Sequence, residues 1–177
     1  MELRLSNIND DLDNKRTIHR KFESMGRHLL LVRLDVLPKK GVPFHWLLEN
    51  GRKPPFDIAI NSEDASIRYI KFFFQDEKIQ LIDKIIKNER VQKGMPCFDV
   101  SIFTEKKYQV LEYGNVEAFL KERELYLIIS NIEKCQFLSL DDNNTIIFDN
   151  NGFCAGILLK HLLDEEFKEL MRSELLP

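Results

Sequence analysis

The chain has 177 residues, of which 44% are apolar and 31% charged, a composition typical of globular proteins rather than disordered ones. Its formal net charge of −3 provides no overall basic field, which disfavours nucleic acid and anionic lipid as partners. We expect a single globular domain over residues 1–177.

The N-terminal part predicts a helix followed by a strand. The opening residues lack the basic start and apolar run of a signal peptide, so we expect a cytoplasmic protein. Ile18, Phe22 and Met25 fall at i, i+4 and i+7 and predict a helix that begins near Asp13. Residues 29–37 place apolar side chains at alternate positions, which predicts a strand.

Residues 38–55 form a candidate binding segment. They hold the one tryptophan of the chain, four prolines and four basic residues, and the run 42–50 is too short for periodicity to separate helix from strand. Tryptophan and arginine are frequent at interface hot spots, and proline-stiffened loops lose less entropy on binding. An alternative is that its apolar side chains plug one end of a sheet. The candidate binding residues are Phe44, His45, Trp46, Arg52 and Lys53.

Residues 54–76 predict a hairpin at the centre of the fold. The first strand places Phe56, Ile58 and Ile60 on one face, and polar turn residues follow it. The returning strand, residues 67–75, carries aromatic side chains on both faces, which predicts a central strand that is covered at least partly on both sides.

The next segment predicts an amphipathic helix over residues 77–90 and a second hairpin over residues 96–113. Both hairpins start with Phe-Asp, so Asp57 and Asp99 occupy equivalent positions. If the hairpins lie side by side, the two carboxylates form a pair suited to acid–base work or cation binding. The alternative, which we favour, is that each carboxylate faces water or accepts backbone hydrogen bonds.

The last third predicts a meander of strands and a closing helix. Asn151-Gly152 is a strong hairpin signal, and Asp164 is placed to cap a helix with Glu165 and Glu166 in its first turn. These elements predict an α+β fold, with a largely antiparallel, multi-stranded sheet built from hairpins and two or three helices packed against it.

The sequence lacks the common catalytic and cofactor motifs. It contains no glycine-rich phosphate cradle, no GxSxG and no HExxH, and its four histidines are dispersed. The three cysteines are widely spaced, and we expect reduced, buried thiols. We therefore predict no cofactor and no metal site.

The leading functional hypothesis is a non-enzymatic binding module whose partner is another protein. In general character the chain resembles small bacterial cytosolic proteins that neutralise a partner, such as the immunity protein of a toxin pair, and this likeness transfers no residue. One alternative is an enzyme or small-ligand binder with a site on the sheet surface that uses Asp57 and Asp99, together with His45 or Arg52. Another is a homo-oligomer, for instance a homodimer, in which an exposed strand pairs across a two-fold axis.

Overall fold

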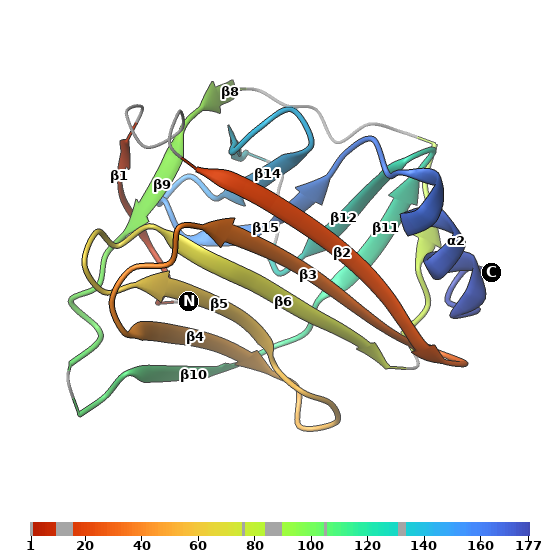
Figure 1. The fold of residues 1–177 in the computed structure, drawn as a ribbon, viewed down its shortest axis with the longest axis horizontal. Coiled ribbons are helices and arrows are strands. Elements are labelled where there is room, and N and C mark those ends of the chain that lie inside the picture. Colours follow the sequence, from red (N-terminus) through yellow and green to blue (C-terminus); the bar gives the residue numbers. More distant parts are fainter. Residues whose placement is uncertain (1, 10–15, 76, 84–89, 105, 131–133) are drawn as a thin grey trace.

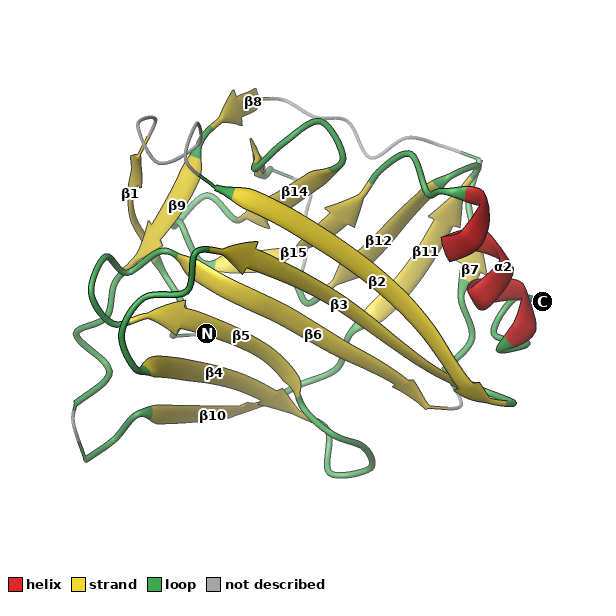
Figure 2. Cartoon of the chain, viewed as in Figure 1, coloured by secondary structure: helices red, strands yellow, loops and turns green. Residues whose placement is uncertain are grey.

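The structure is a computed structural model that describes residues 2–9, 16–75, 77–83, 90–104, 106–130 and 134–177. Strands make up 56% of the chain and helices 6%, with one helix among these described residues. Figure 2 shows strands across the whole molecule and the helix at one side. The prediction of an α+β fold with two or three helices is therefore wrong, and the protein is mostly β.

The first large sheet has six strands. Its neighbours run antiparallel, except that β10 pairs with β4 in parallel, so the sheet is mixed. In spatial order its strands are β10 (Gln109–Tyr113), β4 (Pro43–Glu49), β5 (Phe56–Asn61), β6 (Ile67–Gln75), β3 (Leu29–Leu37) and β2 (Thr17–Gly26).

The second large sheet has seven strands and is also mixed, because β7 and β8 run parallel to their neighbours. A separate antiparallel pair joins β1 (Leu5–Asn9) to β9 (Met95–Phe98). In spatial order the strands of the second sheet are β7 (Gln80–Leu81), β11 (Glu117–Lys121), β12 (Glu124–Ile128), β15 (Cys154–Leu159), β14 (Asn144–Phe148), β13 (Gln136–Ser139) and β8 (Arg90–Lys93).

The main core lies between the two large sheets. In Figure 1 the six-stranded sheet lies in front of the seven-stranded sheet, and α2 (Asp164–Arg172) lies beside the edge strand β2. Buried side chains from both inner faces belong to one apolar cluster, among them Val32, Trp46, Phe72, Leu127 and Ile157. The outer face of the six-stranded sheet is turned toward the viewer in Figure 1, and no described element crosses it.

Several local predictions agree with the structure. Residues 29–37 form β3, and β5 and β6 pair as the predicted central hairpin. The Asn151-Gly152 turn joins β14 to β15. The closing helix is α2, although its N-cap is Leu163 rather than Asp164.

Other predictions are wrong. The helix expected from Asp13 is instead the strand β2 from residue 17 onward, and its first residues lie outside the described part of the chain. A helix was expected over residues 77–90, but Gln80 and Leu81 form the short strand β7. Residues 84–89 lie outside the described part of the chain. The predicted second hairpin does not form, because β9 pairs with β1 and β10 pairs with β4. Residues 42–50, left undecided by periodicity, form β4.

Candidate functional site

The aromatic residues of the candidate binding segment point into the core. Trp46 is fully buried on the inner face of β4, where its indole N–H donates to Glu112 Oε1 at 2.7 Å. Phe44 stacks on Phe103, with ring centroids 4.9 Å apart. Phe44, Trp46 and Leu48 of β4 therefore pack between the two large sheets, whereas Leu47 lies on the outer face.

The two basic candidates lie in the loop between β4 and β5. Arg52 is exposed, and its backbone N–H bonds to the side chain of Asn50. The Lys53 ammonium lies 4.1 Å from the centroid of the Phe72 ring and pairs with Glu77, with its side chain 8% exposed. Burial lowers the pKa of Lys53, and Glu77 acts in the opposite direction. Lys53 thus ties the loop to the sheet, and Arg52 is the one of the two that faces solvent.

His45 points to the outer face of the sheet, because side chains alternate along β4. There it meets Asp57 of β5 and Tyr69 of β6. His45 Nδ1 lies 3.1 Å from Asp57 Oδ1, and the Tyr69 hydroxyl donates to Asp57 Oδ2 at 2.8 Å. Asp57 is 5% exposed, so these two hydrogen bonds satisfy a nearly buried carboxylate.

Two cationic side chains, Arg33 of β3 and Lys71 of β6, lie next to this network. The Arg33 guanidinium lies 5.0 Å from the centroid of the Tyr69 ring, and Lys71 Nζ lies 3.7 Å from Asp57 Oδ2. Arg33 also pairs with Asp35 at 2.6 Å, and this hydrogen bond lowers the pKa of the Asp35 carboxyl against the opposing effect of burial. We call His45, Asp57, Tyr69, Lys71, Arg33 and Asp35 the outer-face cluster.

Hydrogen bonds within the cluster fix the orientation of its polar side chains. Burial, together with the Asp57 carboxylate, raises the pKa of Tyr69, so the phenol remains a donor at neutral pH. Asp57 fixes Nδ1 of His45, while Nε2 bonds to no residue in the described part of the chain. A histidine oriented by a carboxylate in this way can exchange a proton or hold a ligand through its other nitrogen.

No family model matches this chain. A search of curated proteins likewise finds no match to it.

Asp99, the proposed partner of Asp57, belongs to a different part of the molecule. It follows β9, which pairs with β1, and its carboxylate accepts the backbone N–H of Ser101 at 2.9 Å. The Ser101 side chain and then this backbone N–H lower the pKa of Asp99 by hydrogen bonding to its carboxylate. The hydrogen bonds of Asp57 go to other residues, so the two carboxylates serve separate local networks.

Tyr69, Arg33 and Lys71 were missing from the candidates named from sequence. Alternation along β3 and β6 places these three residues on the faces opposite the buried apolar positions. It cannot show which strand lies next to which. The register brings them together, because Asp57 and Arg33 both lie opposite Lys71. A known strand order would have been the signal needed to find them.

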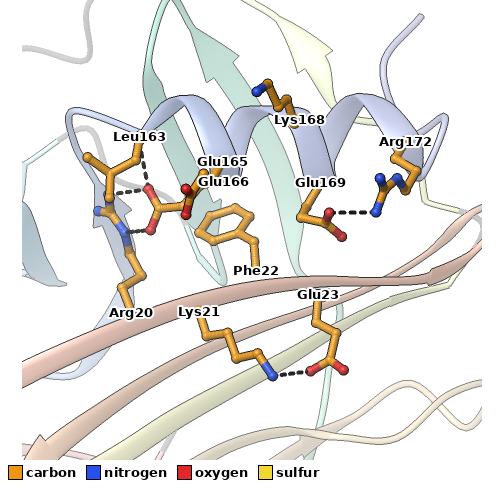
Figure 3. Close-up of a pocket in the computed structure, with 10 residues that line it drawn as sticks. All are labelled: Arg20, Lys21, Phe22, Glu23, Leu163, Glu165, Glu166, Lys168, Glu169 and Arg172. Atoms are coloured by element: carbon orange, nitrogen blue, oxygen red, sulfur yellow. Dashed lines mark hydrogen bonds and ion pairs between the residues drawn. The ribbon is translucent and has the colours of Figure 1, made fainter.

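A groove lies between β2 and α2 (Figure 3). The Arg20–Glu166 ion pair closes one end of it, and Glu169 bonds to Arg172 at the other. Most of its charged lining is paired internally, as Arg20 with Glu166, Lys21 with Glu23 and Arg172 with Glu169. The remaining lining residues are Phe22, Leu163, Glu165 and Lys168.

The thiols are placed as core groups. Cys97, Cys135 and Cys154 are buried and form no disulfide, and burial raises the pKa of Cys154 to about 12. A thiol with so high a pKa is a poor nucleophile at neutral pH. Within the described ranges no group of three or more metal-ligating side chains comes together, and no helix there is long and apolar enough to cross a bilayer.

Proposed function

We propose that the protein is a non-enzymatic binding module whose partner is another protein that docks on the outer face of the six-stranded sheet. One observation carries this proposal: no described element covers that face, yet it holds an ordered set of aromatic and charged side chains. Arginine and tyrosine are the residue types most often found at interface hot spots. The finer proposal is that docking neutralises the partner, as an immunity protein neutralises its toxin.

The structure of the cluster favours binding with little loss of entropy. Arg33 is held by Asp35 and by the Tyr69 ring, and Tyr69 is held by Asp57. Side chains that are already ordered lose less conformational freedom when a partner docks. The sheet supplies a rigid backbone beneath them, which suits recognition of a folded protein.

The test is copurification from the native cell with matched arginine variants. Arg33→Ala removes an outer-face arginine whose partner Asp35 keeps an ion pair to Lys39. The control is Arg172→Ala, which removes an exposed arginine paired with a nearby glutamate on α2. We expect the partner to be retained by the wild type and by R172A, and to bind R33A at least about ten-fold more weakly.

The identified partner is then purified, and its dissociation constant is measured against all three proteins. Equal affinity for R33A and R172A would place the interface elsewhere and contradict the proposal. Failure to recover any partner from the native cell would also count against it. For the finer proposal, the partner must be toxic when expressed alone and harmless when coexpressed with the wild type.

A second candidate function is a small-ligand or acid–base site at the same cluster. The observation in its favour is the Nε2 atom of His45, which bonds to no described residue while Nδ1 is held by Asp57. Screening small carboxylate, phosphate and nucleotide ligands by thermal shift tests it. The expected result is a ligand that stabilises the wild type and not His45→Gln; a screen without such a ligand contradicts this candidate.

A further inference from the structure

The strand β10 leaves one edge of the six-stranded sheet open. In Figure 1 it forms the border of the sheet, with no ribbon beyond it. The opposite edge is guarded, because α2 packs on β2 and the backbone N–H of Ser24 donates to Glu169 of that helix. Exposed edges are often protected by a lysine or a proline on the edge strand, and β10 contains neither.

The backbone groups at this edge are known from the ladder to β4. His45 N–H donates to the Tyr108 carbonyl and Gly114 N–H donates to the Glu49 carbonyl, both at 2.9 Å. In a parallel ladder alternate residues of a strand bond to the same neighbour. The N–H and C=O groups of the residues between, Gln109, Leu111 and Tyr113, therefore point away from β4.

The side chains at these positions are uncharged and exposed. Leu111 and Tyr113 are 46% and 78% exposed on the outer face, and Gln109 is exposed beside them. Leu111 lies directly opposite Leu47 of β4 in the register. An open edge thus coincides with an exposed apolar patch, which is the combination that pairs with a further strand.

We propose that the strand added to β10 is the β10 strand of a second copy of this chain, paired antiparallel about a two-fold axis at Leu111. In this register every outward N–H and C=O group meets its complement, because Leu111 pairs with itself and Gln109 pairs with Tyr113. Leu47 and Leu111 of both copies then form one continuous apolar row, flanked by polar side chains.

The absence of charge at the outward positions of β10 fits pairing with a second copy. Self-pairing usually fails where an edge strand carries charges at its outward positions, since like charges then meet across the axis. The three outward positions of β10 carry none. A five-residue strand supplies only part of the roughly 800 Å² per partner that stable dimers bury, so the dimer should dissociate on dilution.

Light scattering over roughly 1 µM to 1 mM protein tests this proposal. The mass of the wild type should rise from one chain toward two, and Leu111→Lys should remain a single chain because it places like charges at the axis. The control Leu81→Lys changes an exposed leucine of β7, on the other sheet, and should behave as wild type. A wild type that stays monomeric throughout, or L111K that dimerises equally, overturns the proposal.

Cross-linking then tests the register. Residues that pair across a two-fold axis have Cα atoms about 5.5 Å apart, which a disulfide can span. Because the three native cysteines are buried, an introduced thiol reports on its own position. Oxidised Leu111→Cys should give a covalent dimer and Leu81→Cys should not. Equal cross-linking of the two, or none at Leu111→Cys, contradicts pairing at this strand.

Discussion

Phe72 is a core residue of the six-stranded sheet. It is 1% exposed, and its ring meets Phe56 and Phe74 edge to face at centroid distances of 5.6 and 4.7 Å. The Lys53 ammonium covers the ring from the loop between β4 and β5. One side chain therefore joins two strands and a loop.

We expect Phe72→Ala to lower the free energy of unfolding by about 3–5 kcal/mol, because the cavity would lie where the surrounding rings cannot collapse. Urea unfolding followed by fluorescence or circular dichroism measures this change. The matched control is Phe73→Ala, which alters the half-buried neighbour on the outer face and should cost less than about half as much. Equal losses for the two variants would show that the core is not where the structure places it.

For individual residues, the sequence predicted part of the candidate site. His45 and Asp57 were both named, and the enzyme alternative placed them in one site. Tyr69 was not named, because only the register of β4 and β5 with β6 brings it to them. Trp46 was named for its residue type, and its inward direction follows from its position in β4. Residue types could be read from the sequence, whereas neighbours across the sheet could not.

Among the elements, α2 depends on one buried ion pair for its position against β2. Arg20 donates to both carboxylate oxygens of Glu166, each at 2.6 Å, and both side chains are 8% exposed (Figure 3). Arg20 also donates to the carbonyl oxygen of Lys160 at 2.9 Å, so it links the strand to the segment before the helix.

Arg20→Ala should cost about 3–5 kcal/mol of stability, because it leaves the Glu166 carboxylate buried without its partner. The exposed pair of Arg27 with Glu174 provides the control, and R27A should cost less than about 1 kcal/mol. Denaturant unfolding measures both, and hydrogen exchange should show faster opening of α2 in R20A alone. A small cost for R20A, similar to that of R27A, would mean that the ion pair does not hold the helix.

The same arginine explains why β2 was predicted as a helix. The inward positions of the strand hold Ile18, Arg20, Phe22 and Ser24, so the apolar alternation is interrupted by two polar residues. Ile18, Phe22 and Met25 then match helical spacing instead. Arg20 is tolerated at an inward position because it pairs with Glu166. Glu166 lies 146 residues away in sequence, so no local pattern reveals this partner.

The hairpins of β5 with β6 and of β14 with β15 were predicted correctly, whereas β2 was missed although its partner β3 follows it directly in sequence. β10 was predicted as a strand but assigned to the wrong partner, because its parallel pairing with β4 crosses more than fifty intervening residues. Hairpin pairings follow from turn residues, whereas parallel pairings depend on how the whole chain is routed.

For the whole molecule, Arg16 and Asp64 form a junction between segments distant in sequence. Arg16 donates to Asp64 at 2.6 Å, to the Ser66 hydroxyl at 2.8 Å and to the Pro38 carbonyl at 2.7 Å. Ser66 also forms a bridge to Cys97 of β9. The junction therefore connects the start of β2, the end of β3, the turn between β5 and β6, and the β1–β9 pair.

The junction predicts a specific loss of stability in acid. Burial alone would raise the pKa of Asp64, but hydrogen bonds from Ser66 and the charges of Lys40 and Arg16 outweigh it and lower the pKa below its usual value. The native state therefore binds fewer protons at Asp64 than the unfolded state does. Its contribution to stability is complete above the unfolded pKa of about 4 and is lost as the pH falls through the lower native value.

Asp64→Asn should accordingly be less stable than wild type at pH 7, by about 1–2 kcal/mol for the lost charge-assisted hydrogen bonds. Its stability should fall less steeply below pH 4, so that the two curves approach each other in acid. Urea unfolding at pH 2 to 7 measures both curves, with Asp142→Asn, an exposed turn residue, as the control that should run parallel to wild type. A constant difference between D64N and wild type down to pH 2 would show that Asp64 has the same pKa in the native and unfolded states, and that the junction is not held by its charge.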